Sequence, residues 1–475
     1  MTGWPIYAPI KGALVIVGFG SIGQGVLPLI LRHFDIEPTR ITIISADESG
    51  RSVAEEYGVC FVHQAITPDN LEQILSPLFT REGGFLVNLS VDVSSLALVR
   101  FCRTVGAFYL DTCIEPWSGG YTDPDKEMSH RTNYWLREKS LRLAEELGAG
   151  PTAVMAHGAN PGLVSHFMKQ ALVNIAKDTG VDVDTPRTRT EWAALASELN
   201  VQGIHIAERD TQVSDIPKVP GEFVNTWSID GFLSEGMQPA ELGWGTFEGA
   251  LPEDGGEHEE GCGAAIYLKR PGANTRVRTW TPLAGPILGY LITHNEAISI
   301  ADYFTAREED GTVAYRPTCH YAYHPCDDAV LSLHEFVGNG FVPQANFRLM
   351  GDEITKGLDE LGVLLYGHAK NAYWFGSQLD IHETRELVPY QNATGLQVSA
   401  AVLAGMVWAL ENPDEGMVEA EAMNHERILE VAAPYLGPVV GSYTDWTPVT
   451  GRTDDLFPAD YDTSEPWLFK NVICR

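Results

Sequence analysis

Short runs of aliphatic and β-branched residues alternate with amphipathic stretches over the first third of the chain. Such runs are typical of buried parallel strands, and the stretches between them have the spacing of crossover helices. The pattern predicts strands over residues 13–17, 40–45, 58–62, 85–91, 108–112 and 152–156, and helices over 26–34, 131–147 and 163–177. This alternation predicts an α/β fold with a doubly wound parallel sheet of the Rossmann type.

The first strand runs into Gly18-x-Gly20-x-x-Gly23, within the segment ALVIVGFGSIGQG. Gly18 permits a tight turn, Gly20 lets a pyrophosphate approach the backbone, and Gly23 lets helix and strand pack closely. The start of the following helix offers unpaired N–H groups to the phosphates. The order of strand, turn and helix favours a dinucleotide site; the alternative is a glycine-rich turn without a ligand.

The end of the second strand departs from the expected pattern. Folds of this kind place an acid there for the adenosine ribose hydroxyls, but this chain has Ser45, followed by Asp47 and Glu48. No arginine follows directly, which favours NAD over NADP. Asp47 is the candidate ribose contact, and the alternative is that it only caps the next turn.

Two further strands are followed by acids. Asp92 comes after strand 85–91, and Glu115 comes after strand 108–112. Because ligands of open α/β sheets bind beyond the carboxyl ends of the strands, both carboxylates are candidates for contact with a substrate beside the nicotinamide. The alternative is a pair of loop acids that face solvent.

The helix at 163–177 is preceded by the sequence HGANPG. Asn160 followed by Pro161 resembles a helix N-cap with proline at the first helical position. Asn160 either only caps this helix or also brings its N-terminus to the cofactor edge; the two are compatible. The expected cofactor contacts are Gly18, Gly20, Ser21, Ile22, Gly23, Asp47, Ser90, Thr112, Asn160 and Pro161.

From about residue 178 glycine, proline and aromatic residues interrupt the strands, which predicts a second, larger α+β domain. Glu208, Trp227, Asp230 and Glu235 fall within one polar, aromatic stretch, and a largely apolar segment over 281–294 ends in His294. A separate cluster raises the question of zinc: Cys319, His320, His324 and Cys326. Its spacing matches no common structural zinc pattern, so no metal is expected.

A long apolar helix is predicted at 392–412 and could return to cover the first sheet. The tail from about residue 441 predicts an extended wrap or an interface segment. The expected division is an NAD-binding Rossmann domain over 1–150, completed by a helix returning around 390–425. A substrate and dimerisation domain would follow over 151–389, and a C-terminal extension over 426–475.

The composition limits the partners. The 475 residues carry a formal net charge of −32 and are 44% hydrophobic, which argues for a large core and against nucleic acid or an anionic membrane as partners. The seven cysteines form no CxxC pair. No signal peptide and no apolar run long enough to span a bilayer are expected, so the predicted setting is reducing and cytoplasmic.

Several segments together resemble the bacterial homospermidine synthase family, which is related to the saccharopine dehydrogenase fold. They are GFGSIG, NLSVDVSS, DTCIEPW, HGANPGLVSHF, the stretch around Trp227, DELGVLLYGHAKNAYWFGSQL and NATGLQVSAAVLAGMVWALENP. The glycine loop alone is unspecific, whereas DTCIEPW, HGANPG and the long apolar block are specific in combination. The similarity covers nearly the whole chain.

The resemblance implies a homodimer with NAD held as a prosthetic group. It implies oxidation of a putrescine amine carbon, exchange of ammonia for a second putrescine amine, and reduction by the same NADH to sym-homospermidine. Spermidine is implied as a second aminobutyl donor, and the class is alkyl transferase because no net redox occurs. By motif, the implied catalytic residues are Trp227, Glu208, Glu235, Asn160, Glu115, Asp92, His294 and Asp359.

The chemistry of a diamine agrees with this set. A diamine is a dication near neutral pH, so its pocket needs carboxylates, one of which accepts a proton before hydride can leave. An indole face stabilises the resulting iminium, and a closed chamber protects it from water. The alternative on the same fold is a saccharopine- or carboxyspermidine-type dehydrogenase, whose substrates would call for arginines. A non-catalytic NAD-binding sensor would not need Trp227 with converging acids.

Overall fold

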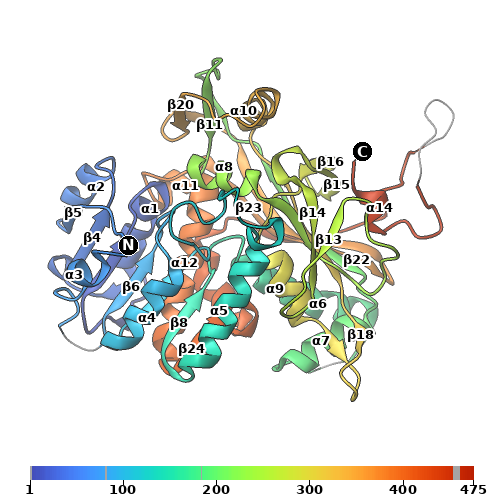
Figure 1. Ribbon diagram of the computed structural model, residues 1–475, viewed down its shortest axis with the longest axis horizontal. Coiled ribbons are helices and arrows are strands. Elements are labelled where there is room, and N and C mark those ends of the chain that lie inside the picture. Colours follow the sequence, from blue (N-terminus) through green and yellow to red (C-terminus); the bar gives the residue numbers. More distant parts are fainter. Residues whose placement is uncertain (1–2, 81–82, 183, 453–460, 475) are drawn as a thin grey trace.

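The computed structural model describes residues 3–80, 83–182, 184–452 and 461–474. Figure 1 shows an N-terminal sheet with its helices beside a second, larger sheet. Helix α12 contacts strands of both sheets and lies between them. The α/β fold predicted from the sequence is confirmed.

The first sheet contains seven strands within the described residues, and every neighbouring pair is parallel. From edge to edge the order is β24 (Glu415–Glu419), β8 (Gly150–Met155), β7 (Phe108–Asp111), β6 (Phe85–Asn88), β2 (Leu14–Val17), β4 (Ile41–Ser45) and β5 (Cys60–His63). The switch in direction of winding lies between β2 and β6, which is where ligands of doubly wound sheets bind. Strand β24 joins from far along the chain, beyond helix α12.

The helices of this sheet are α1 (Ser21–His33), α2 (Arg51–Glu56), α3 (Leu71–Leu75), α4 (Ser95–Val105) and α5 (Asn133–Leu147). Helix α1 begins directly after Gly20, earlier than the predicted residue 26, because the glycine turn leads straight into the first helical turn. All four residues of β2 and of β6 are buried, as expected for central parallel strands.

Helix α12 (Ala393–Glu411) covers β7 and β8 on one side and contacts β22 and β23 on the other. The side chain of Asn392 accepts the Gly395 N–H at 2.8 Å and caps it. By length and composition alone α12 could cross a membrane, which corrects the expectation that no apolar run reaches that length. Its most apolar window is 89% buried inside the protein, so packing between the two sheets accounts for its apolar residues.

The second sheet has ten strands within the described residues. Strands β9 and β19 are parallel neighbours at its centre, and the other pairings are antiparallel. The main path is β13 (Gly255–Glu257), β14 (Ala265–Pro271), β12 (Pro239–Gly243), β19 (Thr318–His324), β9 (Gly203–Asp210), β22 (Leu358–His368), β23 (Asn371–Asp380) and β25 (Val439–Thr444). Strand β16 (Gly285–Tyr290) adds to β19 and pairs with β15 (Arg276–Thr281).

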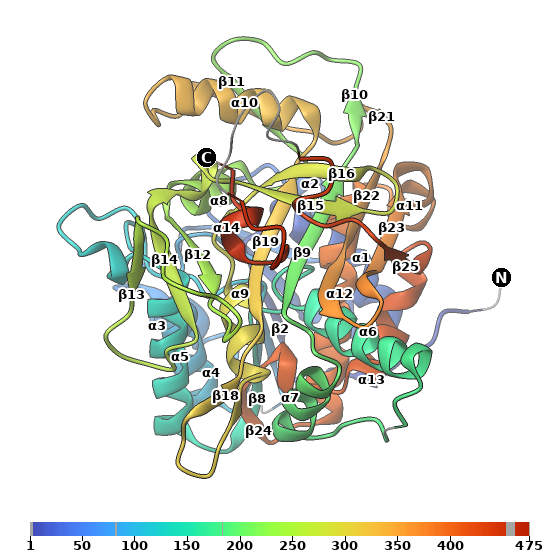
Figure 2. The ribbon, with the colours of Figure 1, turned by 90° about the vertical axis from the view of Figure 1, so that its right-hand side faces the viewer.

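Helices cover this sheet and link it to the first. They are α6 (Leu163–Thr179), α7 (Arg189–Glu198), α8 (Ile229–Met237), α9 (Asn295–Tyr303), α10 (Asp327–Gly338), α11 (Ile381–Leu387), α13 (His425–Ala432) and α14 (Phe469–Val472). Short strand pairs are β1 (Ala8–Pro9) with β3 (Phe34–Asp35), β10 (Val213–Ser214) with β21 (Ile354–Lys356), β11 (Glu222–Asn225) with β20 (Asn346–Leu349), and β17 (Ala306–Arg307) with β18 (Val313–Tyr315). Figures 1 and 2 show β11 and α10 projecting at one end of the molecule.

The predicted C-terminal tail is only partly extended. Strand β25 adds to the edge of the second sheet, and Phe469 and Val472 of α14 are buried in a small core with β12 and β14. The remainder of that tail at 453–460 lies outside the described residues. The division of the chain at residues 150, 389 and 426 stays a prediction.

Candidate active site between the two sheets

The glycine turn has the geometry of a phosphate cradle. Gly18 has a φ of +84°, and a Cβ there would lie 2.7 Å from backbone atoms of Leu89 and Ser90, so only glycine fits. Gly20 is the N-cap residue of α1 and leaves the first N–H groups of the helix without a side-chain partner. A Cβ at this position would meet no atom within 4 Å. The helix N-terminus therefore faces open space, which fits a dinucleotide pyrophosphate. Gly23 packs under Phe19, where a Cβ would overlap the ring at 2.8 Å.

The start of α12 contacts this turn. The side-chain amide of Gln391 donates to the carbonyl oxygen of Ser21 and lies against Gly25. The glycine turn is thus supported by a segment far away in the sequence, while Ser21 and Ile22 themselves are partly exposed.

Asp47 lies at the end of β4, where the ribose contact was predicted. It is exposed, and its Oδ1 accepts the Ser49 N–H at 2.9 Å. Hydrogen bonding from the Ser49 hydroxyl, above all, lowers the pKa of Asp47. The carboxylate therefore caps a turn and remains accessible on the cofactor side of the sheet, so both readings of Asp47 fit its geometry.

Glu115 is buried just after β7. Its carboxylate accepts the Asp92 N–H at 3.3 Å and the Cys113 thiol at 3.2 Å. Burial raises the pKa of Glu115 to about 7, and the charges of Glu235 and Asp92 act in the same direction. Asp92 is itself exposed, with a φ of +66° and a hydrogen bond from Ser118 at 3.1 Å. Hence Glu115 faces the second sheet, whereas Asp92 borders solvent.

The other predicted strand-end contacts lie on the same edge. Ser90 is partly buried, and its hydroxyl donates to Asn88 at 2.6 Å. Thr112 packs against Gly158, in the turn that follows β8. The cofactor contacts at these positions stay predictions.

Asn160 does not cap α6, contrary to the sequence prediction. The N-cap residue is Gly162, with a φ of +120°, and the Gly158 N–H donates to the Pro161 carbonyl at 2.7 Å in the preceding turn. This turn places Asn160 and Pro161 before the helix and frees the Asn160 amide, which donates to Glu208 Oε2 at 2.8 Å. The residue therefore joins the two sheets.

Glu208 lies on β9 of the second sheet and is buried. Besides Asn160, the hydroxyl of Tyr321 donates to its Oε2. Burial raises the pKa of Glu208 to about 7, against these two hydrogen bonds, which lower it. A carboxyl group with that pKa exchanges protons near neutral pH.

Asp359 lies on the neighbouring strand β22, buried and opposite Asp210 of β9. The Thr394 hydroxyl donates to its Oδ2 at 2.5 Å. Burial, followed by the charges of Glu208 and Asp210, raises the pKa of Asp359 well above its usual range. Glu208 lies two residues from Asp210 on β9, on the same face of the sheet as Asp359. Three buried carboxyl groups therefore converge here.

Trp227 lies in the loop between β11 and α8, next to this cluster. Its indole N–H donates to the Tyr323 hydroxyl at 3.1 Å, and its ring lies 4.9 Å from that of Phe232. Tyr323 stacks on Tyr321, with ring centroids 5.3 Å apart. The aromatic group is therefore continuous with the acid that Tyr321 contacts.

His294 connects the remaining acids. Its Nε2 lies 3.2 Å from Glu235 and its Nδ1 lies 3.2 Å from Glu296, while its ring packs on Tyr321. Burial alone would lower the pKa of His294, but the charges of Glu296 and Glu235 reverse this and raise it well above the usual value. The imidazolium with two carboxylates forms the wall nearest Glu115.

The structure thus brings together most of the predicted catalytic residues in a contiguous polar and aromatic group. Its members are Asn160, Glu208, Trp227, Glu235, His294 and Asp359, with Glu115 beside Glu235. Asp230 is exposed and lies outside it. Four further residues of the group were not predicted from the sequence: Tyr321, Tyr323, Glu296 and Thr394. The alternation in TCHYAYH could have revealed the two tyrosines, because every second residue of a strand shares a face.

The same alternation separates the candidate zinc ligands. Cys319 faces the core with Tyr321, whereas His320 faces the opposite side of the sheet and packs on His205 at 4.2 Å. Within the described ranges, no group of three or more His, Cys, Asp and Glu side chains is arranged to hold a metal ion.

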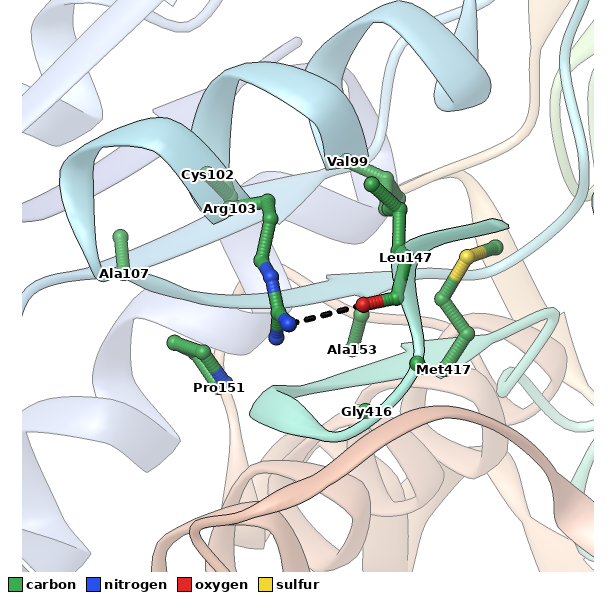
Figure 3. A pocket seen from close by; sticks show the side chains of 10 residues that line it. Val99, Cys102, Arg103, Ala107, Leu147, Pro151, Ala153, Gly416 and Met417 are labelled. Atoms are coloured by element: carbon green, nitrogen blue, oxygen red, sulfur yellow. Dashed lines mark hydrogen bonds between the residues drawn. The ribbon is translucent and has the colours of Figure 1, made fainter. Parts of the chain in front are cut away.

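The hollows found in the described part of the chain include two that this group does not line. The one in Figure 3 encloses only about 10 Å³ between α4, β8 and β24, and the Arg103 guanidinium donates across it to the Leu147 carbonyl at 2.8 Å. A cavity of that size holds at most about one water. The other, of about 560 Å³, is lined by the loop 116–126 that follows Glu115. Its lining begins at Pro116, the residue after Glu115 in the chain.

Comparisons with known proteins agree with this architecture. The family described as "Saccharopine dehydrogenase NADP binding domain" matches residues 14–154, and "Saccharopine dehydrogenase C-terminal domain" matches residues 158–442. Apo saccharopine dehydrogenase from Saccharomyces cerevisiae superimposes with a TM-score of 0.50 at 11% identity, over 91% of this chain and all of that one. That likeness concerns the fold alone.

Full-length relatives are more similar. The chain is 59% identical to homospermidine synthase from Blastochloris viridis over 100% of both chains. It is 54% identical to that of Mesorhizobium japonicum over 99% of this chain and 98% of the relative. The crystal structure of homospermidine synthase from Legionella pneumophila in complex with NAD is 48% identical, with a TM-score of 0.92 over 98% of each chain. The chain belongs to the homospermidine synthase family.

Proposed function

We propose that this chain is a homospermidine synthase that uses NAD. It transfers the aminobutyl group of one putrescine to a second putrescine and releases ammonia, and it also accepts spermidine as donor. The observation that carries the proposal is the convergence of buried carboxyl groups and an indole at the carboxyl edge of a dinucleotide-binding sheet.

The buried acids suit the first requirement of the reaction. An ammonium carbon cannot give up hydride, so the substrate amine must first lose a proton to the protein. Glu208, with its pKa raised to about 7, accepts and returns protons at neutral pH, and Glu115 has a similar pKa at the other side of the group. Glu235 with His294, and exposed Asp92, hold the more distant ammonium groups.

Trp227 suits the second requirement. Oxidation of the amine carbon produces an iminium, and an indole face stabilises a desolvated cation by about 2 kcal/mol. The Tyr323 hydroxyl fixes the indole edge, which leaves the ring face for the substrate. Asn160 positions Glu208 against the nicotinamide side of the first sheet.

The residues around the glycine turn fit the dinucleotide. Bound NAD accepts the hydride and later returns it. Gly18, Gly20, Ser21, Ile22 and Gly23 hold the pyrophosphate through the turn and helix N-terminus, and Asp47 binds the adenosine ribose. Ser90, Thr112, Asn160 and Pro161 line the nicotinamide end. Because the hydride is needed again, NAD stays bound as a prosthetic group and the chemical class is alkyl transferase.

A dehydrogenase for carboxylated substrates is the alternative on this fold. It would need a guanidinium among the acids. Arg209, the cation adjacent to them in sequence, points to the other face of β9, where it contacts His324 at 3.2 Å and Asp327 at 3.6 Å. The site therefore favours an amine without carboxylates.

We further propose a homodimer in the cytoplasm, as the family resemblance implies. All seven cysteines are free, which supports a reducing setting.

Purified protein tests the function directly. Incubated with putrescine, it is expected to form homospermidine and ammonia in equal amounts without accumulating NADH, and to use spermidine with release of diaminopropane. NADH formed in step with putrescine consumption would instead identify a dehydrogenase.

A further inference from the structure

Three buried acids lie side by side on β9 and β22, and they differ in the donors that face them. Among the described residues, Asp210 accepts three hydrogen bonds. They come from the Gln212 N–H at 2.8 Å, the Gln212 side-chain amide at 3.1 Å and the Thr226 hydroxyl at 2.7 Å. Glu208 accepts two, from Asn160 and Tyr321, both on Oε2. Asp359 accepts one, on Oδ2 from Thr394.

Like charges this close do not all ionise, so the group with fewest donors keeps the proton. Asp210 has the most donors and is the carboxylate. Asp359 has the fewest, and its Oδ1 is buried without a donor among the described residues. Glu208 lies two residues from Asp210 on β9 and therefore on the same face of the sheet as Asp359, and its charge acts to raise the pKa of Asp359. A proton on Asp359 removes the repulsion between these neighbouring carboxylates.

The hydrogen-bond directions decide which oxygen of Asp359 carries that proton. The Ala393 N–H can only donate, and it donates to Gln212 Oε1 at 2.9 Å. The Gln212 amide nitrogen is thereby turned toward the Thr394 hydroxyl, to which it donates at 3.2 Å. Thr394 must then use its single hydroxyl proton toward Asp359 Oδ2. Since Oδ2 is an acceptor, the proton of Asp359 lies on Oδ1.

We propose that Gln212 and Thr394 are positioning residues that direct the proton of Asp359 to Oδ1, the oxygen without a donor, so that Asp359 is the protonated partner of Glu208. This rests on the proposed function, in which Glu208 takes a proton from the substrate ammonium. The pair then holds one proton and one negative charge before the reaction. It gains a second proton when the substrate N–H bond breaks and an O–H bond forms on Glu208, and it returns that proton to the departing ammonia.

Thr394 is not required to cap α12. The cap is the Asn392 side chain, which accepts the Gly395 N–H, so the Thr394 hydroxyl is free to serve Asp359. Burial and the neighbouring charges, which raise the pKa of Asp359, agree with a protonated group.

Infrared spectroscopy of the NAD-loaded protein at neutral pH, without substrate, tests the position of the proton. We expect a carbonyl band of a protonated carboxyl group that disappears in Asp359→Asn. In Thr394→Val the band should persist at higher frequency, because the Oδ2 carbonyl loses its hydrogen bond. Thr394→Ser and Ser399→Ala should match the wild type; Ser399 is a buried hydroxyl on the same helix that donates to the Gly395 carbonyl.

The pH profile of kcat/KM for putrescine tests the consequence. Losing a donor makes the acid pair hold its protons more tightly, so Thr394→Val should move the acidic limb up by about one pH unit. Thr394→Ser should restore it, with equal NAD content and melting temperature. A Thr394→Val protein whose band and acidic limb match those of Ser399→Ala would overturn the proposal. If no variant forms homospermidine, the proposed function fails, and the infrared result still decides the proton's position.

Discussion

Trp227 is partly buried and has a fixed orientation, because its N–H is satisfied by Tyr323 and its ring packs on Phe232. A residue held in this way is suited to present one face to a cation. The adjacent carboxyl groups alone could bind amines, but they would stabilise the resting dication as well as the iminium. Under the proposed function, the indole is the group expected to add stabilisation at the iminium.

Trp227→Ala should reduce kcat by about 30-fold, because a desolvated cation–π contact is worth about 2 kcal/mol. NAD should remain bound, since the residue lies in the loop between β11 and α8, outside the first sheet. Trp227→Phe keeps an aromatic face and should fall between alanine and wild type. Single-turnover homospermidine formation measures this, and equal rates for Trp227→Ala and the wild type would remove the residue from the mechanism.

His294 gives a stability prediction with a definite sign. Its folded-state pKa lies above the unfolded value, because Glu296 and Glu235 outweigh burial. Its stabilising contribution is therefore complete below the unfolded pKa of about 6.5 and declines as pH rises through the folded value, by up to about 1.4 kcal/mol per pH unit. The free energies of unfolding of wild type and His294→Gln, measured with denaturant across pH, should differ less on the alkaline side.

The exposed His334 supplies the matched control, since His334→Gln makes the same replacement outside the ion-paired site. If the difference in free energy of unfolding between wild type and His294→Gln widens toward alkaline pH, the assigned ion pairs are refuted.

At the scale of single elements, two glycines of the same turn affect different properties, one the folding of the chain and the other the binding of the cofactor. Gly18 needs its left-handed backbone and its lack of a side chain, because Leu89 and Ser90, just after β6, lie directly against it. Gly20 has an ordinary φ of −70° and open space in front. Gly18 is therefore needed for the backbone of the turn, whereas Gly20 is needed for the space in front of it.

Gly20→Ala should fold with a free energy of unfolding within about 1 kcal/mol of wild type but lose its co-purified NAD, because the new methyl fills the space for the pyrophosphate. Gly18→Ala should itself be destabilised by about 1–2 kcal/mol or more. Thermal unfolding and the NAD content of the purified variants distinguish the two. A Gly20→Ala protein that retains NAD would show that the cradle lies elsewhere.

Elements with a strong local signal were predictable, and those fixed by distant contacts were not. The strand and helix around Gly18–Gly23 follow from local residue order, as does apolar α12. Asn160 was misread because Asn-Pro is a local capping signal, whereas Gly162 takes that position and Glu208, far along the chain, takes the amide. Tyr321 was not predicted because its segment resembled a zinc pattern, although Cys319 and His320 of that pattern face opposite sides of β19.

At the scale of the whole molecule, helix α5 fastens the two sheets together. Glu241 of β12 accepts the N–H groups of Asn133 and Tyr134 at its start. Further along, buried Arg137 bonds to Asp302 and to Glu419. Such contacts hold the acids of the second sheet at the edge of the first.

Arg137→Met should therefore destabilise the protein by about 3–5 kcal/mol, because Glu419 loses its cation and Asp302 keeps only Arg189, at a largely buried site. Arg142, on the same helix, pairs with Glu260 in solvent, so Arg142→Met should cost about 1 kcal/mol or less. Urea denaturation compares the two, and equal losses would show that α5 does not join the sheets through Arg137.

The fold class followed from the sequence because parallel strands leave contiguous apolar runs. The strand order of the second sheet could not be predicted from the sequence, since its strands pair with segments far away along the chain, as β9 does with β19 and β22. The acids of the site were found by resemblance and by position after strands, but their partners emerged only from that pairing.

The central claim is that one bound cofactor takes a hydride and gives it back to the same carbon. Putrescine deuterated at the carbons next to its amino groups tests this most directly, in the presence of excess unlabelled free NADH. The account predicts homospermidine that retains all of its deuterium. Loss of deuterium from the product, with label appearing in the free NADH pool, would contradict it.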